Sequence, residues 1–230
     1  GTLGFLLDEV SRGARFSHVL RRARQRGFTE PDPRDDLSGM DVARKALILG
    51  RLVGYNGELS DIRVESLVPE ALRLVRVEEF LKRVDEMDAP WAVRADEARA
   101  QGHVLRYVAR VTPRRITVGL QSVPAASTFG ALRGTDNQVV FTTTRYRENP
   151  LVITGPGAGP AVTRRRGREA PVGEQGAGQV ARALRRVASV NNISVNPRTT
   201  PEAGFWKHAA DYADNMFDLA NSYLHCAFDL

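Results

Sequence analysis

Apolar residues in the first hundred positions recur at the three- and four-residue spacing of amphipathic helices. Four segments show this pattern: residues 16–27, 39–51, 77–88 and 91–102. In the first segment, Ser17 is placed to cap the helix and Gly27 to end it. The last two segments pair acidic and basic side chains four positions apart, which is typical of helices with one face in solvent. The spacing therefore predicts a helical first half.

A proline-rich elbow separates the first two of these helices. Pro31 and Pro33 each bias the preceding residue away from helical backbone. The sequence therefore predicts a rigid, extended turn over residues 29–36.

From His103 the period changes from helical to alternating. Four segments show the apolar and polar alternation of strands: residues 104–111, 115–123, 137–146 and 150–155. Helices followed by strands favour an α+β fold, in which helices cover one face of a mostly antiparallel or mixed sheet.

The composition changes abruptly after Thr163. Residues 164–198 hold eight Arg against two Glu, with several Gly and Pro, and this pattern is typical of a disordered segment. Residues 199–230 hold five acidic residues against one Lys and are rich in aromatics, which favours one helix over about residues 205–227. We therefore expect a folded domain over residues 1–163, an Arg-rich disordered segment and an unrelated tail.

The overall composition excludes several classes of protein. With 42% hydrophobic and 26% charged residues, the chain has an ordinary globular composition, and no run approaches the roughly 18 apolar residues of a membrane helix. One cysteine, Cys226, excludes an intramolecular disulfide and a Cys-based zinc site. The four histidines show no metal-ligand spacing. We expect a cytoplasmic protein with no membrane partner and no metal.

The net charge of +6 suggests a nucleic-acid partner, but its distribution argues against one. Residues 1–163 carry 24 basic and 20 acidic side chains, with no basic stripe interleaved with aromatic residues. A GC-rich coding sequence, which encodes Arg where other genomes encode Lys, explains the 30 Arg and 3 Lys more simply. We expect no nucleic-acid partner, with an electrostatic tether in residues 164–198 as a weaker alternative.

The densest group of polar residues surrounds the elbow. Asp41 and Lys45 are four positions apart and share one face of the predicted helix, and the elbow directs Glu30 toward them. One interpretation is an exposed ion pair with an N-cap at Asp36 or Ser38, worth a few tenths of a kcal/mol. The other is a lysine acid/base or oxyanion group beside carboxylates that hold a substrate ammonium.

A glycine-rich turn over residues 155–160 follows the last predicted strand. It is similar to a phosphate-binding turn but lacks the full G-x-G-x-x-G pattern, so no dinucleotide-binding unit is supported within the chain. The turn still lets the backbone approach a ligand that another domain holds.

Residues 27–45, GFTEPDPRDDLSGMDVARK, resemble the signature of homoserine dehydrogenase at nearly every position. Other pieces occur in the family's order: Gly1-Thr2, which is similar to the end of an Asn/Ser-Gly-Thr turn, the strand 104–111, and residues 141–163 with their glycine turn. Residues 58–73 are most similar to the bifunctional aspartate kinase–homoserine dehydrogenase branch. The resemblance covers residues 1–163.

This resemblance implies a catalytic, substrate-binding and dimerisation domain. The family interconverts L-aspartate 4-semialdehyde and L-homoserine by NAD(P)-dependent hydride transfer, a step toward threonine, methionine and isoleucine. By position, the resemblance implies catalysis by Lys45, substrate binding by Glu30, Asp41, Asp36 and Thr2, and approach of Gly159 to NADP or NAD. It also implies a homodimer, in the cytoplasm or, for a nuclear gene of a photosynthetic eukaryote, in the plastid stroma.

Three departures from the family pattern stand out. Phe28 occupies a position where Tyr is usual. The family's Rossmann domain has no counterpart in the chain, so we expect the chain alone to be inactive, and a non-catalytic dimerisation or regulatory module is the alternative. After Thr163 the family continues Ala-Ala-Gly, whereas residues 164–167 read Arg-Arg-Arg-Gly, which suggests a shifted reading frame over residues 164–230.

Overall fold

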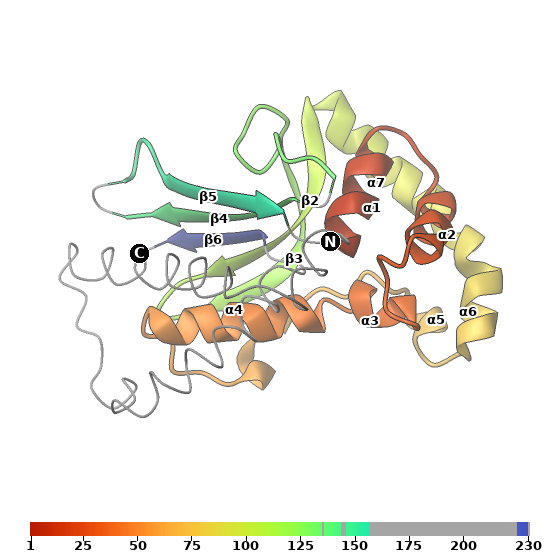
Figure 1. The fold of residues 1–230 in the computed structure, drawn as a ribbon, viewed down its shortest axis with the longest axis horizontal. Coiled ribbons are helices and arrows are strands. Elements are labelled where there is room, and N and C mark those ends of the chain that lie inside the picture. Colours follow the sequence, from red (N-terminus) through yellow and green to blue (C-terminus); the bar gives the residue numbers. More distant parts are fainter. Residues whose placement is uncertain (135, 144–145, 157–224, 230) are drawn as a thin grey trace, which may run out of the picture.

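The computed structural model describes residues 1–134, 136–143, 146–156 and 225–229, which form helices packed on one mixed sheet (Figure 1). The α-helices are α1 (Thr2–Ser11), α2 (Phe16–Gln25), α3 (Pro33–Leu37), α4 (Met40–Leu52), α5 (Glu70–Arg73), α6 (Val77–Arg83) and α7 (Asp88–Ala100). Two short 3₁₀ helices are η1 (Leu59–Asp61) and η2 (Val84–Met87). The strands are β1 (Arg63–Val64), β2 (His103–Val111), β3 (Ile116–Pro124), β4 (Asp136–Thr142), β5 (Leu151–Pro156) and β6 (His225–Asp229).

The six strands form one sheet in the order β1-β3-β2-β6-β4-β5. Two antiparallel pairs, β2 with β3 and β4 with β5, are built from neighbouring segments of the chain. Between them β6 runs parallel to both β2 and β4, and at one edge β1 runs parallel to β3. The predicted α+β class with a mixed sheet is confirmed, as are all four predicted strands.

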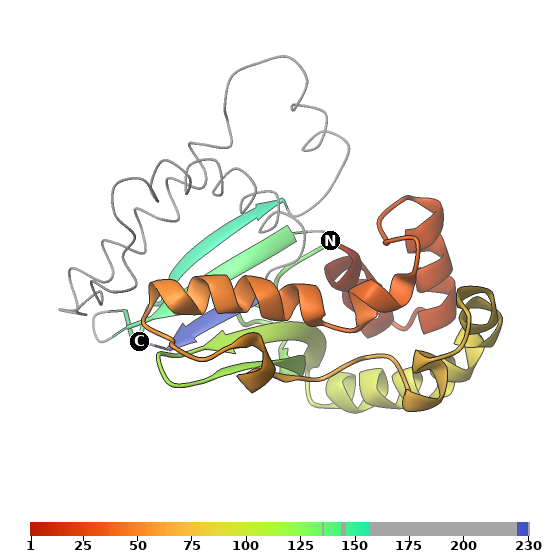
Figure 2. The same cartoon turned by 90° about the horizontal axis from the view of Figure 1, so that it is seen from below.

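The helices pack on the sheet mainly through α4, which lies along β2 and β3 (Figure 2). The side chains of β2 that face α4 and the other helices are Leu105, Tyr107, Ala109 and Val111, and all four belong to the core. Because side chains alternate across a strand, this set is the apolar half of the predicted two-residue pattern. The predicted helix over residues 39–51 is also confirmed, with Val42, Ala43, Ala46 and Leu49 buried.

A second layer of helices extends from one end of the sheet. Helices α1 and α7 both contact β2, and α2 packs on α1 and α7. The rings of Phe16 and Trp91 stack with their centroids 4.8 Å apart and join α2 to α7. No helix in the described ranges is long and apolar enough to cross a membrane.

Two local predictions about the first half were wrong. The elbow is not extended throughout, because Pro33 begins the short helix α3, where its missing N–H costs no hydrogen bond. Ser17 does not cap α2, which begins after Arg15. Instead the buried Ser17 donates hydrogen bonds of 2.8 Å from its hydroxyl and main-chain nitrogen to the Asp88 carboxylate of α7.

The sequence pattern also missed several elements and misassigned one. Helix α1 and strands β1 and β6 were not predicted. Residues 225–227, expected at the end of a helix, belong to β6, which pairs with both β2 and β4 and supplies partners to their main-chain groups. The expected disordered segment 164–198 and the rest of the expected helix lie outside the described residues.

Candidate active site

The candidate site begins with an ion pair on the first turns of α4. The Nζ of Lys45 donates a hydrogen bond of 2.6 Å to Oδ2 of Asp41. The Lys45 side chain is only 4% exposed, whereas the Asp41 side chain is 35% exposed. The predicted pairing across one helical turn is therefore present, but the lysine is buried rather than exposed.

Asp36 provides a second carboxylate from α3. Its Oδ1 lies 3.0 Å from the hydroxyl of Thr2, and its Oδ2 accepts a hydrogen bond of 2.9 Å from the main-chain nitrogen of Glu30. Burial raises the pKa of Asp36 to about 6, although these two hydrogen bonds oppose the shift. The charges of Glu30 and Asp41 raise it further.

The start of α1 packs against α3 at the site. Thr2 is fully buried, and its hydroxyl also donates to the main-chain carbonyl of Phe28. Helix α3 contacts both α1 and α4. Helix α1, the elbow, α3 and α4 therefore meet at one point.

Phe28 has a structural role at this junction. Its ring meets the ring of Phe5 edge to face, with centroids 5.5 Å apart. The Phe28 ring therefore packs against α1, while its carbonyl receives the Thr2 hydroxyl.

The structure brings some of the predicted site residues together and not others. Lys45, Asp41, Asp36 and Thr2 gather around the start of α1, and Glu30 joins them through its main chain and its charge. The Glu30 side chain is exposed. Gly159 lies outside the described residues.

One charged residue close to α1 was not predicted. Asp136, the first residue of β4, lines one small hollow together with Asp8 of α1 and Arg106 of β2. No sequence signal could have found this neighbourhood, because Asp136 lies just before a predicted strand and comes close to α1 only through the fold.

The family model of homoserine dehydrogenase matches residues 1–165. This chain belongs to the homoserine dehydrogenase family. The resemblance carried by residues 27–45 is thus confirmed, and the candidate site lies within the homoserine dehydrogenase part of the chain.

Curated homoserine dehydrogenase relatives match the same part of the chain. A chloroplastic bifunctional aspartokinase/homoserine dehydrogenase of Zea mays is 45% identical over 166 residues, which are 71% of this chain and 18% of the maize protein. A homoserine dehydrogenase of Schizosaccharomyces pombe is 44% identical over 172 residues, covering 71% of this chain and 46% of the yeast protein. The chain therefore spans less than half the length of these relatives.

Solved structures agree with this fold. A protein of unknown function from Candida auris has a TM-score of 0.64 and 34% identity, covering 83% of this chain and 51% of that chain. A homoserine dehydrogenase of Thiobacillus denitrificans has a TM-score of 0.52 at 20% identity, covering 87% of this chain and 40% of that chain. The second likeness concerns the fold alone.

Proposed function

We propose that residues 1–163 form the substrate side of a homoserine dehydrogenase, which interconverts L-aspartate 4-semialdehyde and L-homoserine. The observation that carries this proposal is the buried Lys45, which pairs with Asp41 inside the segment that the family model matches. Burying a lysine costs free energy unless its charge is paired, and buried ionisable groups are common at functional sites. The position of Lys45 therefore favours a chemical role over a surface ion pair.

Lys45 stabilises and protonates the reacting oxygen. Reduction of the aldehyde builds negative charge on that oxygen, and an ammonium group held in a buried site stabilises this charge strongly. The Nζ of Lys45 then gives its proton to the alkoxide. Asp41, which contacts Nζ at 2.6 Å and is partly exposed, connects the lysine to solvent for reprotonation.

The carboxylates hold the amino end of the substrate. The charges of Glu30 and Asp41 act on the Asp36 carboxyl, and three carboxylates of this kind suit an α-ammonium group. Thr2 fixes the orientation of Asp36 through its 3.0 Å contact. Placing the ammonium here orients the far end of a four-carbon amino acid toward Lys45.

In the proposed reaction a nicotinamide cofactor, NADP or NAD, supplies or accepts the hydride. Among the described residues, the strand followed directly by a helix is β1 before α5, and the linking residues 65–69 contain no glycine. This connection does not fit a dinucleotide phosphate, which needs a glycine turn at a helix start. We therefore assign no cofactor contact to the described residues, and the role of Gly159 stays a prediction.

Lys45→Met tests the proposal, because it keeps most of the side-chain volume and removes the charge. In this segment joined to a dinucleotide-binding domain of the family, we expect kcat for L-homoserine oxidation to fall by about a hundredfold or more. The free energy of unfolding should change by less than about 1 kcal/mol, because the apolar side chain removes the buried charge and the Asp41 carboxylate left behind is 35% exposed to solvent. Lys82→Met, which changes an exposed lysine of α6, is the control. Near-normal turnover by folded Lys45→Met contradicts the catalytic role.

We also propose that the chain forms a homodimer through its sheet, on the face away from α4. In the edge strand β5, Leu151 and Ile153 pack against the core, so Val152 points to the opposite face. A charge at this position should disrupt the pairing. We expect a dimer at tens of micromolar by light scattering, a monomer for Val152→Asp, and an unchanged dimer for Val93→Asp on the exposed face of α7. A monodisperse wild-type monomer contradicts the proposal.

A further inference from the structure

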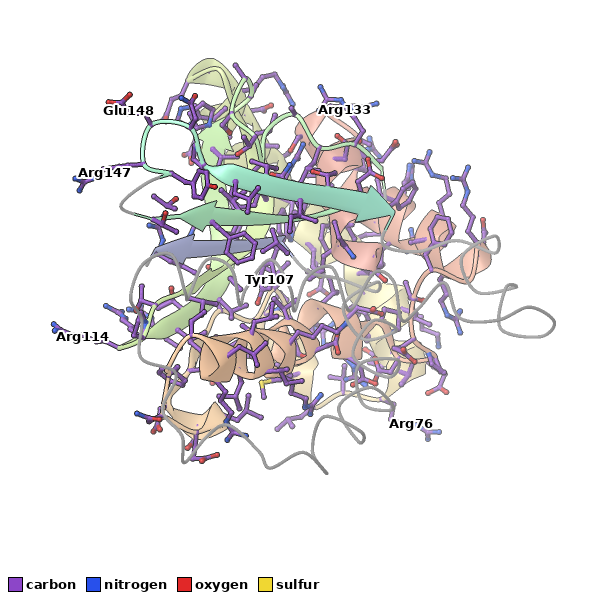
Figure 3. All side chains as sticks on the ribbon, turned by 60° about the vertical axis from the view of Figure 1, so that its left-hand side comes forward. Arg76, Tyr107, Arg114, Arg133, Arg147 and Glu148 are labelled. Atoms are coloured by element: carbon purple, nitrogen blue, oxygen red, sulfur yellow. The ribbon has the colours of Figure 1, made fainter. Side chains whose placement is uncertain are left out.

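The tip of a buried tyrosine presses against the backbone at the start of α4. Tyr107 lies in the middle of β2 and is 2% exposed; Figure 3 shows it between the sheet and the helices. Gly39, the N-cap of α4, has a φ of 75°, which favours glycine. A Cβ at Gly39 would lie 1.8 Å from the Tyr107 hydroxyl oxygen and 2.8 Å from Cζ, so only a glycine fits against this ring.

The Tyr107 hydroxyl is itself held in place. It donates a hydrogen bond of 2.6 Å to the main-chain carbonyl of Glu65. The main-chain nitrogen of Glu65 donates to the carbonyl of Val118 at 2.9 Å, and its carboxylate accepts from the nitrogen of Leu120 at 3.0 Å. Three hydrogen bonds thus tie the tip of Tyr107 to the edge of the sheet through one residue.

Gly39 stands between the two site carboxylates of α3 and α4. Asp36 comes three residues before it and Asp41 two residues after it, and Lys45 follows one helical turn beyond Asp41. The carbonyl of Gly39 accepts the first helical hydrogen bond of α4, from Ala43 at 3.0 Å. A displacement of Gly39 would therefore change the position of Asp36, on one side, relative to Asp41 and Lys45, on the other.

We propose that Tyr107 is a positioning residue for the candidate site, acting through Gly39 to set the separation of Asp36 from the Asp41 and Lys45 pair. The inference rests on the proposed function, because it assigns these three residues to one substrate. In this proposal Tyr107 touches the backbone of Gly39 and does not touch the substrate. It affects the reacting groups only by fixing the position of that backbone. Burial raises the pKa of Tyr107 above its ordinary value, so the hydroxyl keeps its proton and the contact persists across the working pH range.

Tyr107→Phe removes the contacting oxygen and keeps the ring. Its matched control is Tyr55→Phe, which removes the hydroxyl of another buried tyrosine; this hydroxyl lies against Gly57, beyond the far end of α4. In the chain as it stands, we expect amide resonances of Asp36, Asp41 and Lys45 to shift in Tyr107→Phe and to stay in place in Tyr55→Phe. In the segment joined to a dinucleotide-binding domain, kcat/KM for L-homoserine should fall about tenfold in Tyr107→Phe alone, with the KM for the dinucleotide unchanged.

Gly39→Ala provides a rescue test. Alone, it drives a methyl group into the tyrosine oxygen and should lower kcat/KM for L-homoserine more than Tyr107→Phe does. Combined with Tyr107→Phe, the loss should be smaller than the product of the two single losses, because the clashing oxygen is gone. Circular dichroism before each assay confirms that the variants are folded.

The outcomes separate this inference from the proposed function. An active wild type with equal kinetics for Tyr107→Phe and Tyr55→Phe, or with multiplicative losses in the double variant, overturns the positioning role. A wild type without homoserine turnover overturns the proposed function, and the amide resonances of the chain itself then decide the inference. Unshifted Asp36, Asp41 and Lys45 amides in Tyr107→Phe overturn it in that case.

Discussion

Among the residues that the structure describes, two cations are buried, Lys45 and Arg106, and their partners are of opposite kinds. Lys45 bonds the carboxylate of Asp41, a side chain that reaches solvent. Arg106, 2% exposed on β2, uses four of its five N–H groups on the carbonyls of residues 105, 129, 130 and 132. The hydrogen bonds of Arg106 to main-chain carbonyls hold a loop in place. The ammonium of Lys45, which pairs with a partly solvated carboxylate, can exchange that partner for a substrate group during a reaction.

The counterions differ in the same way. Asp8 lies 3.7 Å from Arg106, is itself buried, and also accepts a hydrogen bond of 3.2 Å from the nitrogen of Gly134. The Arg106 and Asp8 pair thus joins β2, α1 and the loop before β4. We assign a structural role to this pair and a chemical role to Lys45 and Asp41.

Arg106→Gln should have the largest effect on stability. It leaves the loop carbonyls without their donor and removes the buried arginine of the two that lie beside Asp8, and breaking a buried pair in this way costs about 3–5 kcal/mol. Urea unfolding of the chain measures this loss. Arg110→Gln, on the same strand but exposed, should change the free energy of unfolding by less than about 0.5 kcal/mol. Equal effects of the two variants would remove the contrast between the cations.

The two pairs were not equally predictable from the sequence. Asp41 and Lys45 are four residues apart on one helix, so local spacing was enough to bring them together. Arg106 occupies the outward position of an alternating strand, and its burial depends on a loop more than twenty residues away folding over it. The sequence showed only that Arg106 lies inside the apolar run 104–111. It did not indicate which groups bind this arginine.

Separation along the chain also explains which other features of the fold were predicted. The strands over residues 103–124 and the helix from Met40 were predicted because their periodicity is local. The contact of Thr2 with Asp36, the bond of Ser17 to Asp88 and the pairing of β6 were not, since each joins segments far apart in the chain. For the site itself, the family signature supplied roles that periodicity could not.

Asp36→Asn tests whether the buried carboxyl of Asp36 makes the free energy of unfolding depend on pH. The folded pKa of Asp36, about 6, lies above its ordinary value of 3.8, so folding favours the neutral acid. The stability that the neutral acid contributes is fully present below about pH 4 and is lost as the pH rises through 6, by about 3 kcal/mol. Urea unfolding from pH 4 to 8 should show this fall in the wild type and in Asp35→Asn, an exposed neighbour, and a flatter profile in Asp36→Asn. A wild-type profile no steeper than that of Asp36→Asn contradicts the shift.

Arg12→Ala has the smallest expected effect on the free energy of unfolding. It tests whether an exposed arginine stabilises the fold as a buried one does. Arg12 contacts the same carboxylate, Asp8, at 3.0 Å, which is shorter than the 3.7 Å contact of Arg106. Its side chain is 57% exposed, however, and exposed pairs contribute less than about 1 kcal/mol.

Double-mutant cycles with Asp8→Asn decide whether distance or burial ranks the two arginines. A roughly fourfold lower effective dielectric around the buried Arg106 outweighs its longer contact, so we expect the larger coupling free energy for the Arg106 cycle. The coupling of Arg12 should also fall in about 0.5 M salt, while that of Arg106 should persist, because buried charges are screened less. A larger coupling for Arg12 would mean that proximity outranks burial here, and the structural role of Arg106 would then rest on its backbone carbonyls alone.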